Sequence, residues 1–267
     1  MSLSDDEVER YARHIVLREV GGTGQAKLRQ ARVLVIGVGG LGSPVLLYLA
    51  AAGVGALGVV DFDTVSLSNL QRQIAHATVD VGRLKTESAH DTIKAINPGV
   101  LVERHAFRLT ADNAQSLIAR YDIVADGSDN FATRFLVNDA CFLAERTLVS
   151  AAVTEFDGQL STFKAHDRLH PSPCYRCLFP APPPPGTVQS CSETGVLGAA
   201  AGVMGTLQAL EVIKEITGIG DTMAGRLLIY EALNTRFRTV SFKPDPACTL
   251  CGATPTIRDL SSHTTQT

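Results

Sequence analysis

Two pairs of cysteines have the Cys-x-x-Cys spacing, Cys174 with Cys177 and Cys248 with Cys251. Each pair forms one knuckle, and two knuckles together supply the four thiolates of a tetrahedral zinc site. Because four cysteines leave no open position for a substrate, the spacing predicts a structural Zn²⁺ rather than a catalytic one. A redox-active dithiol is the alternative, although a single pair at the start of a helix would suffice for that chemistry. The pairs are far apart in the sequence, so the fold must close the site.

A glycine-rich turn, Gly37-x-Gly39-x-x-Gly42, follows the apolar run at residues 32–36 and precedes an Ala- and Leu-rich stretch. A strand, this turn and a helix form a nucleotide-binding pattern, because the glycines let phosphate approach the amino end of the helix. Asp61 ends the next apolar run, where an acid that accepts hydrogen bonds from ribose hydroxyls is expected. A glycine turn without a ligand is the alternative.

The polar side chains that follow Asp61 help to distinguish which nucleotide is bound. An NAD-dependent oxidoreductase uses the same turn but needs few cations, whereas opening a triphosphate requires cations and magnesium around the phosphoryl oxygens. Arg72 and Lys85 fit that need, and Asp129, with Asn130 beside it, follows a later apolar run and could hold Mg²⁺. The two cations could also be solvated surface residues, and the Asp-Asn pair a turn and helix cap.

The elements that must position these residues alternate between strand and helix in the first part of the chain. We expect strands at 32–36, 57–61, 100–104, 122–126 and 147–151, and helices at 43–52, 84–96, 112–119 and 134–144. This order is typical of a Rossmann-like, doubly wound α/β sheet, mainly parallel and covered on both faces. In the C-terminal third, residues 158–164, 226–230 and 237–242 are expected to add antiparallel strands to the same sheet.

The remaining segments complete the expected organisation. A capping box at Ser4 and Glu7 predicts a helix that runs to about Leu17. The apolar stretch 195–213 is interrupted by polar residues, so a buried helix is favoured over a membrane span.

We expect one domain over residues 1–252, with a proline-rich surface loop at 178–194, and a disordered tail over 253–267.

Composition narrows the class of protein. The 267 residues are 45% hydrophobic, which is enough to form a sizeable core without crosslinks. The 24 basic residues do not exceed the 27 acidic ones, so nucleic acid is not expected as a partner. The first residues lack the basic and apolar segments of a secretory signal, so we expect a cytoplasmic protein with reduced cysteines.

Taken together, the motifs resemble the MoeB/ThiF/HesA branch of the ubiquitin-activating-enzyme-like superfamily from about residue 4 to residue 252. The resemblance is carried by Arg10-Tyr-Ala-Arg13, the turn at 37–42, the segment Asp61-Phe-Asp-Thr-Val-Ser-Leu-Ser-Asn-Leu-Gln-Arg72, Lys85, Ile96-Asn-Pro98, Asp129-Asn130 and the two cysteine pairs. It implies an adenylyltransferase that binds ATP and Mg²⁺ and activates the C-terminal Gly-Gly carboxylate of a small β-grasp, ubiquitin-like protein.

The same resemblance implies a role for individual residues. Gly40 would lie against the nucleotide, Asp61 would hold the ribose, Asp129 would serve magnesium and catalysis, and Arg13 would reach into the site of the other subunit of a homodimer. The residues implied at the nucleotide, several of them at its phosphates, are Ser68, Asn69, Leu70, Gln71, Arg72, Lys85 and Asn130. A general base is not required, because a carboxylate nucleophile is already ionised at neutral pH.

Two cysteines lie outside the pairs. Cys191 follows the prolines, and in relatives a cysteine of the corresponding loop forms a thioester or an acyl persulfide with the activated carboxyl; a free surface thiol is the alternative. Cys141 lies in an apolar stretch and is expected in the core.

Within the branch, the N-terminal helix and the segment that follows Asp61 look closer to MoeB-type enzymes. These activate the small subunit of molybdopterin synthase in molybdenum cofactor biosynthesis. ThiF-type enzymes, which act on the thiamine sulfur carrier, are the alternative, and the segment 203–210 suits them as well. No sulfur-donating extension follows Cys251, so a separate sulfur donor protein is expected.

Overall fold

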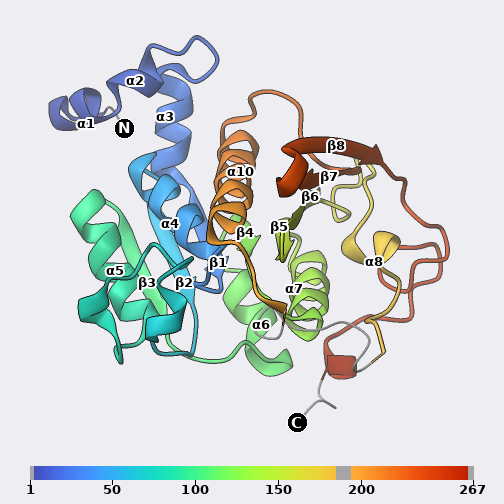
Figure 1. Ribbon diagram of the computed structural model, residues 1–267. Helices are drawn as coiled ribbons and strands as arrows, with labels where there is room; N and C mark the ends of the chain where they lie inside the picture. Colours follow the sequence, from blue (N-terminus) through green and yellow to red (C-terminus); the bar gives the residue numbers. More distant parts are fainter. Residues whose placement is uncertain (1–2, 185–193, 264–267) are drawn as a thin grey trace.

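A sheet of eight strands runs through the computed structural model, which describes residues 3–184 and 194–263 (Figure 1). The strands lie in the order β3-β2-β1-β4-β5-β6-β7-β8; neighbours from β3 to β5 are parallel, and those from β5 to β8 are antiparallel. Their bounds are β1 Arg32–Ile36, β2 Ala56–Val60, β3 Leu101–His105, β4 Ile123–Asp126, β5 Thr147–Thr154, β6 Asp157–Phe163, β7 Arg226–Glu231 and β8 Arg236–Ser241. The predicted fold class is confirmed.

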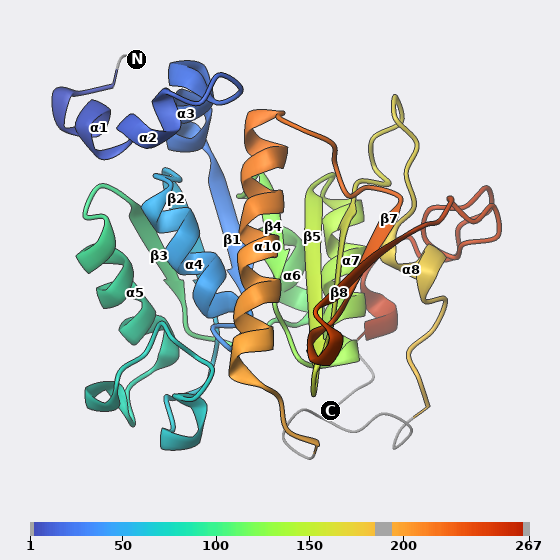
Figure 2. The ribbon, with the colours of Figure 1, turned by 45° about the horizontal axis from the view of Figure 1, so that its top comes forward.

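Helices cover both faces of the parallel part because successive side chains of a strand point to opposite sides. In β1, Val33 and Val35 join one core cluster and Leu34 and Ile36 join the other. In Figure 2, α10 lies in front of the sheet, over β4 and beside β5, and α6 and α7 lie behind the sheet. The first face is covered by α3 Gly21–Gln30, α4 Gly42–Ala51, α5 Lys85–Ile96 and α10 Gly198–Thr217, and the second by α6 Ala111–Ile118 and α7 Phe131–Leu143.

The chain reverses its direction across the sheet between β1 and β4. From β1 it proceeds outward through β2 to β3, and it then crosses back to place β4 on the other side of β1. The loops after β1 and β4 therefore lead to opposite faces of the sheet, and ligands of open α/β sheets bind in the crevice between such loops. The glycine turn after β1 and Asp129 after β4 both lie at this position.

The amino-terminal segment forms two short helices where one helix to Leu17 was predicted. The capping box is confirmed, since the Ser4 N–H donates to Glu7 Oε2 (2.8 Å) and the Glu7 N–H donates to Ser4 Oγ (3.2 Å). The helix α1 Asp5–Arg10 ends at Tyr11, and α2 Ala12–Ile15 follows. Tyr11 is buried and its hydroxyl accepts a hydrogen bond from Asn97 Nδ2 (2.8 Å), so a tertiary anchor accounts for the break.

The end of the described chain differs from the disordered tail that we expected over 253–267. Leu260 is buried in the core cluster of the second face, and Ser261–His263 form a short 3₁₀ helix. His263 Nε2 lies 2.8 Å from Asp139 Oδ2 of α7. Leu260 and His263 are single contacts among polar residues and form no periodic pattern, so the sequence did not reveal them. Residues 264–267 lie outside the described part.

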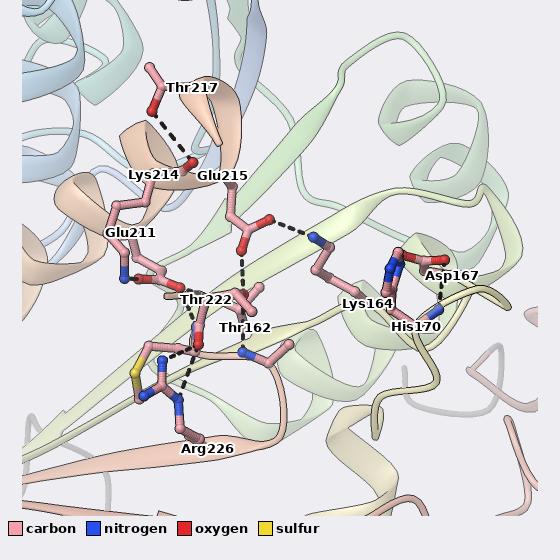
Figure 3. A network of polar contacts seen from close by, with 12 residues as sticks. Thr162, Lys164, Asp167, His170, Glu211, Lys214, Glu215, Thr217, Thr222 and Arg226 are labelled. Carbon is pink, nitrogen blue, oxygen red and sulfur yellow. Dashed lines mark hydrogen bonds and ion pairs between the residues drawn. The ribbon is translucent and has the colours of Figure 1, made fainter. Parts of the chain in front are cut away.

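A polar network fastens the carboxyl end of α10 to the antiparallel strands (Figure 3). Glu211, which is buried, accepts hydrogen bonds from Thr162 Oγ1 (3.0 Å) and from the Met223 N–H (2.6 Å). One turn further along, Glu215 pairs with Lys164 at 2.8 Å. The contacts of Glu211 explain one polar interruption of the apolar segment 195–213. In the described residues no helix is long and apolar enough to cross a membrane.

Candidate nucleotide site and candidate zinc centre

A cavity lies where the chain reverses between β1 and β4, and its wall includes six of the residues predicted for the nucleotide. They come from the turn after β1, the end of β2, the segment that follows it, the start of α5 and the turn after β4. These residues are Gly40, Asp61, Arg72, Lys85, Asp129 and Asn130.

The glycine turn is packed too closely for side chains. Gly37 has a φ of +85°, and a Cβ on Gly42 would lie 1.8 Å from the Gly37 carbonyl oxygen. The Val38 N–H donates to Asp61 Oδ2 (2.8 Å), and the ring of the buried His76 contacts the Val38 carbonyl oxygen (3.2 Å). The turn is thus held from both sides, with its conformation set before any ligand arrives.

Lys85 is the first residue of α5 and lies buried beside two acids. Its Nζ is 2.9 Å from Asp63 Oδ2 and 4.0 Å from Asp61 Oδ2. Asp61 in turn accepts hydrogen bonds from the N–H groups of Val38 and Asp63. Lys85 is therefore not a solvated surface cation, and its ammonium group is held in the wall of the cavity.

The segment before Arg72 supports this side chain rather than lining the cavity. A short 3₁₀ helix, Leu67–Asn69, is closed by Asn69, whose Oδ1 accepts from the Ser66 N–H (3.2 Å). Arg72 Nη1 donates to the Ser68 carbonyl (3.1 Å). Ser68, Asn69, Leu70 and Gln71 are absent from the wall of the cavity as far as the described residues show.

For Asp129 and Asn130 the sequence left two roles open, magnesium binding and capping of a helix, and the structure separates them. Asn130 caps α7, because its Oδ1 accepts from the Thr133 N–H at 2.8 Å. Asp129 is exposed to the cavity, and its Oδ1 lies 3.4 Å from Asn130 Nδ2. A carboxylate in that position offers the oxygen ligands that Mg²⁺ prefers.

The cavity also contains polar groups that the sequence reasoning missed. Gln73 Oε1 and Ser128 Oγ are buried without a hydrogen-bond partner among the described residues, and both residues line the cavity. Arg108 stacks over the Phe62 ring, 4.0 Å from its centroid, and forms a flat wall. Unsatisfied buried polar atoms are costly, so these groups fit a polar ligand, and the flat wall fits a purine base. No motif marks them in the sequence.

A second, larger cavity adjoins the first and forms a groove on the face of the antiparallel strands. It encloses about 940 Å³ and is lined mainly by β5, β6 and β7. Four residues, Asp129, Asn130, Arg134 and Val153, belong to the walls of both the cavity and the groove. A molecule in the groove can therefore reach a nucleotide in the cavity.

Arg13, which the resemblance assigns to the site of the other subunit, does not reach the cavity of its own chain. Arg13 is exposed on α2, and Figure 2 shows α2 beside the end of the sheet where β1 begins, whereas the cavity lies where β1 ends. Arg13 accordingly does not line the cavity of its own chain. Cys191 lies outside the described residues. Cys141 is buried in the core, as predicted.

The four paired cysteines converge at the edge of the molecule, between the short helix α8 Tyr175–Leu178 and the segment after β8. Their Sγ atoms all lie within 4.8 Å of one another, with 3.6 Å between Cys174 and Cys248 and 3.4 Å between Cys177 and Cys251. Tetrahedral zinc with Zn–S bonds of about 2.3 Å requires sulfurs about 3.8 Å apart. The donor set and its spacing therefore fit Zn²⁺.

A backbone donor and a buried apolar side chain flank this cluster. The Asp245 N–H donates to Cys177 Sγ at 3.3 Å, a contact that favours the thiolate form of this residue. The buried Leu250 packs against the cluster, which limits the access of water to it.

Comparison with known proteins places the chain in a family. The model of the ThiF family matches residues 11–250. A sulfur carrier protein adenylyltransferase of Thermus thermophilus is 49% identical over 98% of this chain and 97% of its own length. The probable adenylyltransferase/sulfurtransferase MoeZ of Mycobacterium tuberculosis is 51% identical over 98% of this chain but only 65% of its own length, so this chain spans about two thirds of that relative.

Solved structures agree with the fold. A crystal structure of Escherichia coli MccB superposes with a TM-score of 0.79 at 21% identity, covering 94% of this chain and 75% of that one. At this identity the match concerns architecture alone, and the mixed sheet is common to both. The family match and the two relatives at about half identity exclude an NAD-dependent oxidoreductase as the best description, and the chain belongs to the ThiF family.

Proposed function

We propose that this protein is an ATP-dependent adenylyltransferase that activates the C-terminal carboxylate of a sulfur carrier protein. The observation that carries the proposal is the shared wall of the cavity and the groove at Asp129 and Asn130. A nucleotide in the cavity and an extended peptide tail in the groove would meet there. The Thermus thermophilus relative is named a sulfur carrier protein adenylyltransferase, and the match covers 97% of its length.

The residues of the cavity fit the parts of ATP. The glycine turn lets phosphate approach at Gly40, and Asp61 retains lone pairs for ribose hydroxyls after accepting two backbone N–H groups. Arg72 and Lys85 supply positive charge for the phosphates. These cations offset the repulsion between the anionic triphosphate and an incoming carboxylate.

The reaction is a displacement at the α-phosphorus. One carboxylate oxygen of the carrier forms a bond to the α-phosphorus, and the bond from that phosphorus to the bridging oxygen of the β-phosphate breaks. Pyrophosphate leaves with the electron pair, and the carrier becomes an acyl-adenylate. No proton is transferred and nothing is oxidised, so positioning and charge account for the catalysis.

Two metals belong to this proposal. Mg²⁺, which Asp129 would hold, supplies charge stabilisation for the phosphoryl oxygens and the leaving pyrophosphate. Zn²⁺ on the four cysteines would fasten the segment after β8 to the segment that follows β6. With four protein ligands the zinc would have a structural role.

The carrier that we favour is the small subunit of molybdopterin synthase, a β-grasp protein that ends in Gly-Gly, with the thiamine sulfur carrier as the alternative. Exchange of radiolabelled pyrophosphate into ATP, measured with each carrier in turn, tests the activity and the choice together. We expect exchange that depends on the carrier and is lost in Asp129→Ala at unchanged zinc content. Absence of exchange with every Gly-Gly-ended carrier would contradict the proposal.

We also infer a homodimer in which Arg13 serves the cavity of the other subunit, since Arg13 does not line the cavity of its own chain. Mixing the Arg13→Ala and Asp129→Ala variants tests this arrangement. Each variant alone should be inactive, whereas a mixed dimer contains one site with both residues intact and should regain part of the activity. Full activity of Arg13→Ala alone, or no recovery in the exchanged mixture, would refute the arrangement.

A further inference from the structure

Arg134 in α7 is a buried cation at the boundary between the cavity and the groove. Its side chain belongs to both walls, although the residue is only 8% exposed. Arg72 and Lys85 line the cavity alone. Arg134 is therefore the cation of the nucleotide cavity that also faces the groove in the described structure.

The charge of Arg134 is not neutralised by an ion pair. Its Nη1 donates to the Ala151 carbonyl (3.1 Å) and its Nη2 to the Ser128 carbonyl (2.5 Å). Within residues 3–184 and 194–263, no carboxylate oxygen lies within 4.0 Å of its nitrogens. Asp126 is the acid buried nearby, and it makes no such contact with Arg134; burial raises the pKa of its carboxyl, and the charge of Arg134 lowers it.

A guanidinium group has five N–H donors, and the two carbonyls use two of them. A buried cation without an anionic partner is unfavourable, and this cost falls when an anion binds beside it. The N–H groups of a guanidinium make charge-assisted hydrogen bonds to carboxylate and phosphate oxygens alike. The position on the groove side favours the anion that arrives through the groove.

We infer that Arg134 binds the C-terminal carboxylate of the carrier and positions it against the α-phosphate. This inference rests on the proposed function. One carboxylate oxygen would be held by the guanidinium group while the other remains free to form the bond to phosphorus. The two carbonyl contacts fix the side chain from behind, so little ordering is needed on binding.

A purely structural role makes a different prediction. If Arg134 only braces the carbonyls of Ser128 and Ala151, its loss should weaken the binding of any carrier equally. If Arg134 recognises the carboxylate, its loss should abolish the distinction between a carboxylate and a neutral group at the end of the carrier.

The test compares two carriers, one with the natural C-terminal carboxylate and one with a C-terminal amide. Their affinities are measured by calorimetry for the full-length protein, for Arg134→Met and for Arg238→Met, a groove cation absent from the wall of the cavity. We expect the amide to bind the unmodified protein about tenfold to a hundredfold more weakly, as for the loss of a hydrogen bond between charged groups. In Arg134→Met the two carriers should bind equally. In Arg238→Met the amidated carrier should still bind more weakly than the natural one, by the same factor as in the unmodified protein; we call this factor the amide penalty.

Persistence of the amide penalty in Arg134→Met would overturn the inference. Zinc content and binding of a non-hydrolysable ATP analogue establish that this variant is folded; if it is not, Arg134→Lys replaces it and should show a reduced penalty. An unreduced penalty in Arg134→Lys would count against the inference in the same way. Pyrophosphate exchange by the unmodified protein separates the two claims, because its absence contradicts the proposed function, whereas exchange with a persistent penalty contradicts only the role of Arg134.

Discussion

Replacing Asp139 by Asn should destabilise the fold strongly. Asp139 in α7 is fully buried and accepts hydrogen bonds from Arg176 Nε and Nη2, both at 2.7 Å. It also accepts from Asn138 Nδ2 (2.9 Å) and contacts His263 Nε2 (2.8 Å). The side chain thus joins α7 to α8, which contains Cys177 of the cluster, and to the end of the described chain.

The expected magnitude follows from the donors around the carboxylate. An Asn amide nitrogen in the place of Oδ1 would face Arg176 Nε, and in the place of Oδ2 it would face Arg176 Nη2. In either orientation two donors oppose each other, and the Arg176 side chain, 10% exposed, loses its counter-ion. Leaving a buried charge without its partner costs about 3–5 kcal/mol.

Urea unfolding of the full chain, followed by circular dichroism, measures this loss. Asp91→Asn is the matched control, because Asp91 pairs with Arg83 at 2.6 Å but its side chain is 59% exposed. Surface pairs of this kind contribute only about 0–1 kcal/mol. A loss of less than about 1 kcal/mol in Asp139→Asn would refute the reasoning, since it would place Asp139 in the class of surface pairs.

The same variant has a predicted pH dependence. Burial alone would raise the pKa of Asp139, but hydrogen bonds from His263 and Arg176 outweigh this effect and lower the pKa below its usual value. A carboxyl whose pKa is depressed in the folded state stabilises the fold above its unfolded pKa of about 3.9 and loses this contribution as the pH falls through the folded value. The difference in the free energy of unfolding between the unmodified protein and Asp139→Asn should therefore become smaller below about pH 3.9.

Three further predictions follow from separate features. Elemental analysis should find one zinc per chain, lost in Cys248→Ser but kept in Cys141→Ser, whose buried thiol lies outside the cluster; equal loss in both would contradict the assignment. Gly42→Ala should abolish binding of an ATP analogue, because its Cβ would meet the Gly37 carbonyl oxygen at 1.8 Å, whereas Gly22→Ala, with no atom within 4 Å, should bind normally; binding by Gly42→Ala would show that the turn can open. Glu211→Ala should lower the free energy of unfolding by about 1–3 kcal/mol, because the Thr162 and Met223 donors lose their acceptor, and an unchanged urea midpoint would contradict the network.

Much of the architecture could be predicted from the sequence because hydrophobic periodicity and turn residues act locally. The alternation of strands and helices up to residue 151 was confirmed, as were the antiparallel strands that follow. The break at Tyr11 and the packing of Leu260 were not predicted, because both depend on partners distant in the sequence. Such contacts depend on the tertiary fold, and the hydrophobic pattern within one stretch of sequence carries no information about them.

The candidate site shows the same division. Motif spacing predicted residues of the cavity, among them Asp61, Lys85 and Asp129. It did not reveal Gln73 or Arg134, whose significance comes from burial without sufficient partners. A polar residue in a sequence carries no sign of whether the fold will satisfy it. For Arg134 the neighbours that decide this are the carbonyls of Ser128, after β4, and of Ala151 in β5.

The measurement that tests the central claim most directly is the intact mass of the carrier after incubation with this protein, ATP and Mg²⁺, in the absence of a sulfur donor. The account predicts a carrier population heavier by one adenylyl group, which returns to the original mass on adding pyrophosphate and does not form with a carrier whose C-terminus is amidated. The same mass increase on the amidated carrier, or no increase on any Gly-Gly-ended carrier, would contradict it.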